Sequence, residues 1–207
     1  MALDVSEVGS TPPITDELGL EIITKINSVC NKLFLCYYFV TGTALGLART
    51  GKCMEYDVDV DFAISFDDYN RLQELLNEMD QEGFDHLSTH TYKGRIEQIG
   101  WMYKEILVDV TIHHIRDSEV WATSQDIQED GTIQWVDKAY PSVLFEDKEF
   151  IPVYGTKLEV PVPNPIEDYL KINYGDDWKI PQPDYWKKYG YYSHRECIRK
   201  NWDKTQP

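Results

Sequence analysis

The sequence predicts an α+β domain in which a mixed β-sheet is flanked by helices and followed by a C-terminal helical and aromatic segment. Two stretches carry apolar residues at helical spacing, and several shorter stretches read as strands. The feature that organises them is an alternating acidic stretch, YDVDVDF, which follows an apolar segment and a Gly-Thr turn. Alternation of this kind is typical of a strand with one polar and one apolar face.

Length and composition favour one domain. The chain has 207 residues, of which 42% are hydrophobic and 13% aromatic, as in globular proteins. Residues 1–14 contain Gly9, Pro12 and Pro13 and are expected to form a flexible N-terminal leader. We therefore expect a single domain over residues 15–207.

Charge and cysteine usage restrict the class of partner and the compartment. There are 36 acidic and 20 basic residues, giving a net charge of −16, which disfavours a polynucleotide partner because such binding depends on Lys and Arg. No apolar run is long enough to predict a membrane span or a signal peptide. The four cysteines show no paired spacing, so we expect a reducing, cytoplasmic setting without a zinc site.

The first part of the chain predicts a helix, a strand and a second, short helix. The first helix begins at Thr15 or Asp16, and an apolar stripe predicts its buried face: Leu18, Ile22, Ile26, Val29 and Leu33. Leu35 to Val40 reads as a buried strand, and the turn Thr41-Gly42-Thr43 leads into a helix from Ala44 to Arg49. Gly42 allows a ligand to approach the backbone closely, and helix N-terminal amides suit an anion such as phosphate.

The acidic strand is the strongest indication of chemistry. If Asp57 to Phe62 is a strand, Asp57, Asp59 and Asp61 line one face, about 6.6 Å apart from one to the next. Such carboxylates repel one another, and a hard cation among them would offset the repulsion. The rival interpretation is a solvated edge strand in an acidic protein.

Further elements follow in order. Ser65 and Asp68 predict the start of a helix that ends near Gly83, and its apolar face comprises Tyr69, Leu72, Leu75, Leu76 and Met79. Strands are expected near 84–91, 95–103 and 106–115. Asp109 lies in the last of these, and we interpret it as completing the acidic cluster from a neighbouring strand, with a hydrogen-bonded structural Asp as the rival.

Two histidines and the later segments carry weaker indications. His113 and His114 face opposite ways in a strand, so at most one could join the site, and a structural role is expected for both. Residues 117–131 read as a polar excursion, and strands are expected near 132–136 and, as a hairpin, within 150–160.

The C-terminal part predicts a helix rich in aromatic neighbours. Asn164 is a natural N-cap, Pro165 suits the first helical position and Gly175 a stop. Four residues in or after this helix either form a base-stacking or cationic-headgroup pocket or pack the tail against the sheet: Tyr169, Tyr174, Asp177 and Trp178. Residues 187–207 are expected to form a last, basic and aromatic helix.

The segments TGTALGLARTGK and YDVDVDF, in this order, resemble the LicD/fukutin family of the nucleotidyltransferase superfold, although Val58 interrupts the family's usual acidic run. The later segment PNPIEDYLKINYGDDWKIPQPDY resembles that family's C-terminal motif. The resemblance implies a nucleotidyltransferase-like mixed sheet flanked by helices. It also implies transfer of a phospho-substituted group, such as phosphocholine or a polyol phosphate, from a CDP-activated donor to a glycan or small hydroxyl acceptor.

The resemblance assigns roles to particular residues. Asp57, Asp59, Asp61 and Asp109 would hold Mg²⁺, or Mn²⁺ in its place, and Asp59, Asp61 and Asp109 would be catalytic. Contacts to the donor would come from two blocks, comprising Gly42, Thr43 and Arg49 in the first and Tyr169, Tyr174, Asp177 and Trp178 in the second. Two alternatives remain open: a nucleotidyltransferase that moves NMP from an NTP onto a small molecule or protein, and an inactive nucleotide-binding module.

Overall fold

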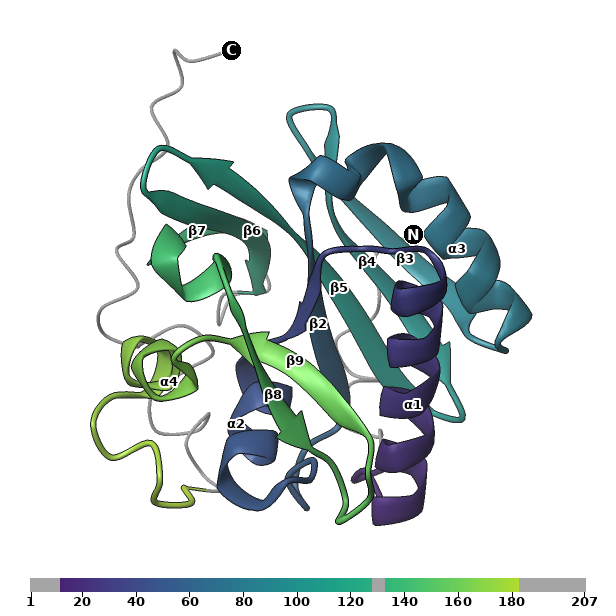
Figure 1. Ribbon diagram of the computed structural model, residues 1–207. Helices are drawn as coiled ribbons and strands as arrows, with labels where there is room; N and C mark the ends of the chain where they lie inside the picture. The colour runs from purple at the N-terminus through teal and green to yellow at the C-terminus, as the bar shows by residue number, and fades with distance from the viewer. Residues whose placement is uncertain (1–11, 128–132, 183–207) are drawn as a thin grey trace.

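The computed structural model describes residues 12–127 and 133–182, and its centre is a seven-stranded mixed sheet (Figure 1). Five strands lie in the order β1-β2-β5-β4-β3, and β6 pairs with the far end of β5 and with β7. The strands are β1 (Tyr37–Phe39), β2 (Asp59–Ser65), β3 (Asp85–Tyr92), β4 (Arg95–Tyr103), β5 (Ile106–Arg116), β6 (Glu119–Ile127) and β7 (Ile133–Pro141). β2 and β5 are parallel, whereas the other pairs are antiparallel.

Two helices cover the apolar face of the sheet. Helices α1 (Asp16–Lys32) and α3 (Leu72–Gln81) lie against each other, and Tyr103 of β4 donates a hydrogen bond to Glu21 of α1. The core beneath them is formed by the alternate residues of β2, β4 and β5 that point away from the carboxylates, including Val60, Phe62, Ile64, Ile99, Trp101, Val108, Val110 and Ile112. This face anchors the sheet and leaves its other face for the carboxylates.

The remaining elements lie on the side of β1 and around the carboxylate face. Strands β8 (Lys148–Pro152) and β9 (Glu159–Pro163) form a hairpin, as the sequence predicts. This hairpin packs against β1. Helix α4 (Ile166–Tyr174) follows and packs against α2 (Thr41–Thr50). Among the described residues, no helix is long and apolar enough to cross a membrane.

Helix α2 begins earlier than expected, at Thr41 instead of Ala44. Val40 is extended and caps the helix, so Gly42 and Thr43 belong to its first turn and not to a preceding loop. Thr41 has a φ of 47°, which is uncommon for a β-branched residue, and side-chain contacts described below hold it there.

The acidic strand is shorter than expected, because β2 starts at Asp59 and excludes Asp57. The backbone of Asp57 is used elsewhere: its N–H donates to Met54 O at 3.0 Å, and its carbonyl accepts from Ile14 N at 3.0 Å. Ile14 itself is buried, at the end of the segment expected to be a loose leader.

The polar excursion predicted for residues 117–131 is wrong. Residues 119–127 form β6, which pairs with both β5 and β7. Val120, Ala122 and Thr123 are buried in this strand. Its polar composition does not predict a strand, and hydrogen bonding to both neighbouring strands stabilises it.

Two helix predictions need correction. The helix expected from Ser65 to Gly83 is divided into a 3₁₀ segment, η2 (Phe66–Arg71), and α3, because Asp68 accepts a hydrogen bond from Cys36 N and holds its turn against β1. Ile166 and not Pro165 starts α4, since Asn164 N donates to the carbonyl of Leu144 beside the 3₁₀ segment η3 (Ser142–Phe145). Gly175 ends α4 as predicted, whereas the last helix expected within 187–207 lies outside the described residues.

Candidate active site

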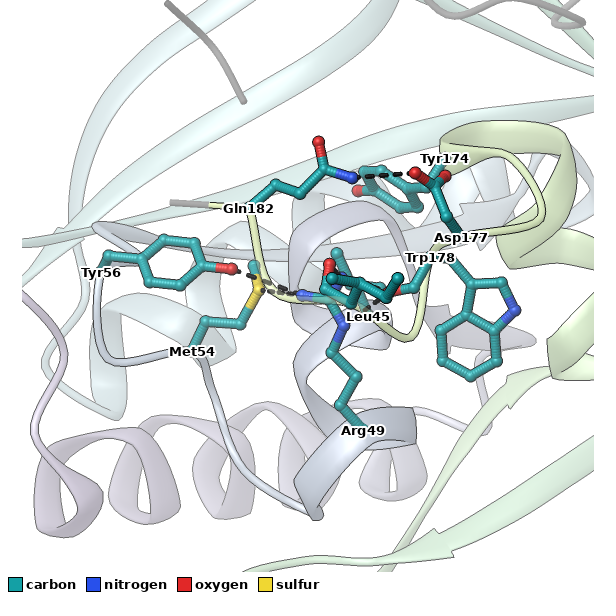
Figure 2. A pocket seen from close by; sticks show the side chains of 9 residues that line it. Leu45, Arg49, Met54, Tyr56, Tyr174, Asp177, Trp178 and Gln182 are labelled. Atoms are coloured by element: carbon teal, nitrogen blue, oxygen red, sulfur yellow. Dashed lines mark hydrogen bonds between the residues drawn. The ribbon is translucent and has the colours of Figure 1, made fainter. Parts of the chain in front are cut away.

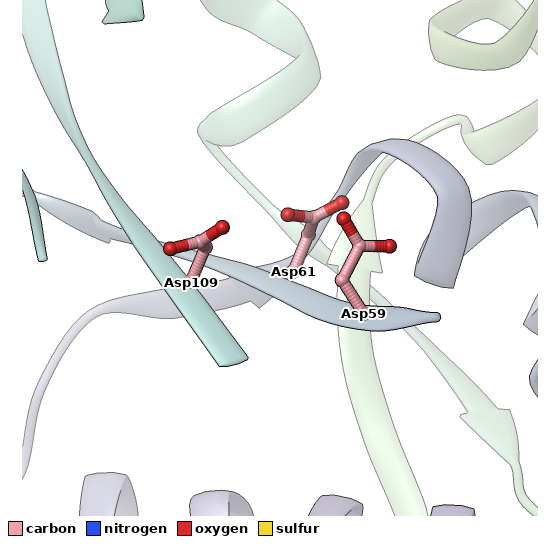
Figure 3. Close-up of side chains that lie close together, drawn as sticks. All are labelled: Asp59, Asp61 and Asp109. Atoms are coloured by element: carbon pink, nitrogen blue, oxygen red, sulfur yellow. The ribbon is translucent and has the colours of Figure 1, made fainter. Parts of the chain in front are cut away.

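Three carboxylates meet on one face of the sheet where β2 and β5 run in parallel (Figure 3). The register sets Asp61 directly opposite Asp109, and Asp59 lies two residues before Asp61 on the same face. One oxygen from each of Asp59, Asp61 and Asp109 lies within 4.8 Å of the others. We call these three residues the acidic triad.

The N-terminal turn of α2 is bonded directly to the triad. The hydroxyl of Thr41 donates to Oδ2 of Asp61, and the backbone N–H of Asp61 donates to Oγ1 of Thr43 at 2.8 Å. The amide of Thr41 in turn donates to the hydroxyl of Tyr169 at 3.1 Å. These bonds fix the first helical amides, which lack intrahelical partners, beside the carboxylates.

Asp57 stands next to the triad but outside the group of oxygens within 4.8 Å. It is buried, its Oδ2 has no hydrogen-bond partner among the described residues, and this atom lies 3.2 Å from where a Cβ on Gly42 would be. The glycine therefore allows a carboxylate to pack against the start of α2, which a side chain would obstruct.

The four carboxylates raise one another's pKa. Burial is the largest cause in each case, and the charge of a neighbouring carboxylate adds to it, although a side-chain hydrogen bond with Asp59 partly lowers the pKa of Asp57. The pKa is raised to about 7 for Asp57 and Asp61 and to about 8 for Asp109, and that of Asp59 is raised well above its ordinary value. Mutually repelling carboxylates that are buried, as in Asp57, or half-buried, as in the triad, are costly without a compensating positive charge.

The donor set fits a hard divalent cation. Mg²⁺ and Mn²⁺ prefer carboxylate oxygens as ligands. The site offers such oxygens on two adjacent strands, together with the unpartnered buried oxygen of Asp57, and all of these groups are negatively charged when ionised. Asp59, Asp61 and Asp109 would hold the cation, and Asp57 stands close enough to Asp59 to share a side-chain hydrogen bond with it.

Sequence reasoning missed Gly100, which makes room for Asp109. It lies opposite Asp109 in the β4–β5 register, and a Cβ there would be 2.9 Å from Oδ1 of Asp109 and 2.8 Å from Oγ of Ser88. A glycine inside a predicted strand is the sequence feature that indicates such a close approach.

A pocket of about 410 Å³, including its open mouth, lies between α2 and the segment after α4 (Figure 2). Its apolar wall comes from residues such as Leu45, Met54 and Trp178, and its polar groups include Tyr56 and Asp177. The 54–56 segment leads directly into the triad strand, so the pocket opens at the start of β2.

Arg49 holds this pocket together. Its Nε donates to the carbonyl of Trp178 at 2.7 Å and its Nη2 to that of Ile180 at 3.0 Å, while Nη1 lies 3.3 Å from the hydroxyl of Tyr56. The sequence left open whether Arg49 supports the loop or contacts a phosphate; in the structure its guanidinium supports the loop that follows α4.

The structure separates the four aromatic and acidic residues of the C-terminal block. Tyr169 is only 1% exposed, and its hydroxyl accepts the hydrogen bond of the Thr41 amide. Tyr174, Asp177 and Trp178 line the pocket instead. The charges of Asp61, Asp57 and Asp59 contribute, after burial, to a raised pKa of Tyr174, so this side chain lies within their field. Asp177 is exposed and accepts a hydrogen bond from Gln182 at 3.0 Å.

The two histidines face opposite sides of β5, as predicted. His114 is bonded to the buried Glu97 at 2.6 Å on the helix-covered face. His113 lies on the triad face in an aromatic cluster with Tyr140 and Phe145, and burial, followed by the charges of His114 and Lys138, lowers its pKa to about 3.

Comparison with known proteins agrees with this arrangement. The family model LicD/FKTN/FKRP, nucleotidyltransferase domain, matches residues 35–164. A search of curated proteins finds no significant match.

Solved structures give weaker likenesses. The antibiotic-resistance factor ANT(2'')-Ia matches in solution with 18% identity, a TM-score of 0.39 and coverage of 50% of this chain and 51% of that one. Its crystal structure with adenylyl-2''-tobramycin matches with 20% identity, a TM-score of 0.37 and coverage of 48% and 52%. A candidate nucleotidyltransferase from Thermotoga maritima matches with 14% identity, a TM-score of 0.42 and coverage of 73% and 80%. The chain thus spans about half the length of the first two.

The mixed sheet flanked by helices, with the acidic triad and the helix start bonded to it, is a domain of the nucleotidyltransferase fold. Within that class, the chain belongs to the LicD/FKTN/FKRP family. The match covers the glycine turn, the triad and Gly100, and it ends before α4 and the block that supplies Tyr169, Tyr174, Asp177 and Trp178.

Proposed function

We propose that this protein is a Mg²⁺-dependent transferase that moves a phospho-substituted group, such as phosphocholine or a polyol phosphate, from a CDP-activated donor to a hydroxyl of a glycan or small molecule. The observation that carries the proposal is the acidic triad beside the first turn of α2. A triad of half-buried carboxylates with a helix N-terminus next to it suits a substrate that brings both phosphate and a divalent cation.

The chain offers separate places for the parts of the donor. The pocket beside α2, with Tyr56, Tyr174 and Trp178 in its lining, suits a nucleoside, because aromatic and apolar walls stack on a base and the polar groups orient it. The first amides of α2 point to the start of the same site and suit the diphosphate. In this arrangement Gly42 and Thr43 contact phosphate, Asp177 and Trp178 contribute to the pocket, and Tyr169 positions Thr41.

The reaction is a substitution at phosphorus. The acceptor oxygen forms a bond to the phosphorus of the transferred group, the bond from that phosphorus to the bridging oxygen breaks, and CMP leaves with the electron pair. Asp59 and Asp61 keep the cation and diphosphate in place, and Asp109 accepts the proton of the acceptor hydroxyl. Mg²⁺ held by these carboxylates would neutralise the phosphate oxygens and lower the pKa of the acceptor hydroxyl.

The proposal is tested in two stages. Thermal-shift assays with CDP-choline, CDP-ribitol, CDP-glycerol, CTP, UTP and ATP, each with and without MgCl₂, should show stabilisation by a CDP-linked donor that depends on Mg²⁺. Turnover of that donor with an acceptor should then release CMP. Release of pyrophosphate from an NTP instead would identify a nucleotidyltransferase, and absence of any nucleotide-dependent shift would contradict the proposal.

A further inference from the structure

Lys138 is a cation on the same face of the sheet as the acidic triad. It lies in β7, and the strand registers connect it to the triad face step by step: Ser65 of β2 is opposite His113 of β5, His113 is opposite Ala122 of β6, and Ala122 is opposite Lys138. Residues opposite one another in a sheet point to the same face. Lys138 therefore shares its face with the acidic triad.

Its charge reaches the site. Lys138 lowers the pKa of Asp61, against the larger effects of burial and of Asp59 that raise it, and it is among the charges that lower the pKa of His113. Its side chain is half-buried, next to the cluster that contains Tyr140. A cation that shares the face of the triad, and whose charge acts on Asp61, is placed to meet an anion that the triad also binds.

The position of Lys138 relative to the pocket decides which part of the donor it meets. The pocket opens at the start of β2, where Met54 and Tyr56 lead into the strand, whereas the row that ends in Lys138 begins at Ser65, the last residue of β2. The triad lies between the two. Figure 1 shows the same separation, with α2 and the β6–β7 hairpin at opposite ends of β2.

Arg49, another cation near the site, is on the pocket side, where it donates hydrogen bonds to the carbonyls of Trp178 and Ile180. A diphosphate that lies across the triad with its nucleoside in the pocket directs its second phosphate toward the β7 side. We propose that Lys138 binds the phosphate of the transferred group, and that it distinguishes donors with a second phosphate from the nucleoside monophosphate product. This inference rests on the proposed function.

The inference has a functional consequence for product release. Once the transferred phosphate has moved to the acceptor, the departing CMP no longer carries the group that Lys138 holds. Lys138 then contributes to the affinity of the donor and not to that of the product, which favours exchange of product for substrate.

The test compares CMP and CDP, because they differ only in the phosphate that Lys138 should bind. Calorimetric titrations in MgCl₂ on Lys138→Gln should show affinity for CDP reduced about tenfold or more, with affinity for CMP within about twofold of wild type. Retained CMP binding also reports that the variant is folded. Lys138→Arg should restore CDP binding to within a few-fold, and Lys171→Gln, an exposed residue of α4, should change neither affinity.

Each other outcome contradicts the inference. Equal loss of CMP and CDP binding in Lys138→Gln would assign Lys138 a general structural or electrostatic role, and unchanged CDP binding would remove it from the site; both leave the proposed function standing. A wild-type protein that binds neither nucleotide in MgCl₂ would instead overturn the proposed function, and this inference with it.

Discussion

Asp61 is the residue at which most contacts of the site converge. Its backbone amide is bonded to Thr43, its carboxylate to Thr41, its strand partner is Asp109, and its backbone carbonyl accepts from Val40 N at 3.3 Å. One residue thus links the strand, the helix start and the neighbouring strand. Changes at this position should affect chemistry and stability in opposite directions.

We expect Asp61→Asn to reduce turnover by about 100-fold or more, because it removes a charge that holds the cation and diphosphate. The same change should raise the melting temperature of the metal-free protein at pH 8, because it relieves repulsion among buried carboxylates. Kinetic assays and thermal melts in EDTA measure the two effects. Asp80→Asn, an exposed change on α3, is the matched control and should alter neither; a melting temperature for Asp61→Asn that falls in EDTA would contradict the account.

Gly100→Ala should act through Asp109. The added Cβ would lie 2.9 Å from Oδ1 of Asp109, so the carboxylate must move away from the position that the triad requires. We expect cation affinity, measured by Mn²⁺ titration, to fall about tenfold or more while the fold is kept. Adding Ser88→Gly to Gly100→Ala removes the second close contact and leaves the one with Asp109. If this double variant regains full cation affinity, Asp109 is not the side chain that Gly100→Ala displaces.

For single residues, the sequence predicts which side chains belong to the site better than it predicts which groups they contact. The alternation Asp57-Val58-Asp59-Val60-Asp61 identifies the carboxylates, because side-chain direction in a strand follows from spacing alone. It wrongly includes Asp57 in the regular strand, because the backbone hydrogen bonds of Asp57 to Ile14 and Met54 cannot be read from the spacing. A glycine inside a predicted strand indicates a close approach at Gly100, but the identity of its neighbour, Asp109, and the place of Lys138 follow only from the register of the strands.

At the scale of elements, α2 is held at both ends by the segment that includes α4. Tyr169 accepts from Thr41 N at the start of α2, and Arg49 near its end binds the carbonyls of Trp178 and Ile180. The C-terminal block therefore clamps both ends of α2 and also forms a wall of the pocket.

Tyr169→Phe tests this clamp. It leaves the partly buried amide of Thr41 without its partner, which costs about 1–3 kcal/mol of unfolding free energy and loosens the helix start. Tyr140→Phe is the matched control, because it also removes a buried hydroxyl bond, to Asn173 at 3.0 Å, without touching α2. Denaturant melts and donor titrations should show comparable stability losses but weaker donor binding only for Tyr169→Phe; equal binding in both variants would exclude the clamp.

Elements with a strong local pattern could be predicted, and those defined by their neighbours could not. The stripe of α1, the strand from Arg95 to Tyr103 and the stop at Gly175 all follow from spacing or backbone conformation. The strand β6 could not, because its polar residues acquire strand structure through pairing with β5 and β7. The expected start of α2 at Ala44 was late because a threonine with positive φ lies outside local preferences.

At the scale of the whole molecule, the net charge of −16 and the buried carboxylates make stability depend on pH and on divalent cations. The folded-state pKa values of Asp57, Asp61 and Asp109, at about 7, 7 and 8, lie above their unfolded values of about 3.9. The folded protein thus binds more protons than the unfolded chain between about pH 4 and pH 8. Stability of the metal-free protein is full below this range and falls as pH rises through it.

We therefore expect the melting temperature in EDTA to fall between pH 5.5 and pH 8, and the increase produced by MgCl₂ to be larger at pH 8 than at pH 5.5. The Asp61→Asn/Asp109→Asn double variant should flatten both trends. A metal-free melting temperature that rises toward pH 8 would show that these carboxyl groups are not the ones that govern stability.

The most direct test of the account is the location of the cation. Anomalous diffraction from crystals soaked in MnCl₂ should show a peak among the carboxylates of Asp59, Asp61 and Asp109, which is lost in Asp61→Asn. A well-occupied Mn²⁺ bound elsewhere on the protein, with none at these three side chains, would contradict the account.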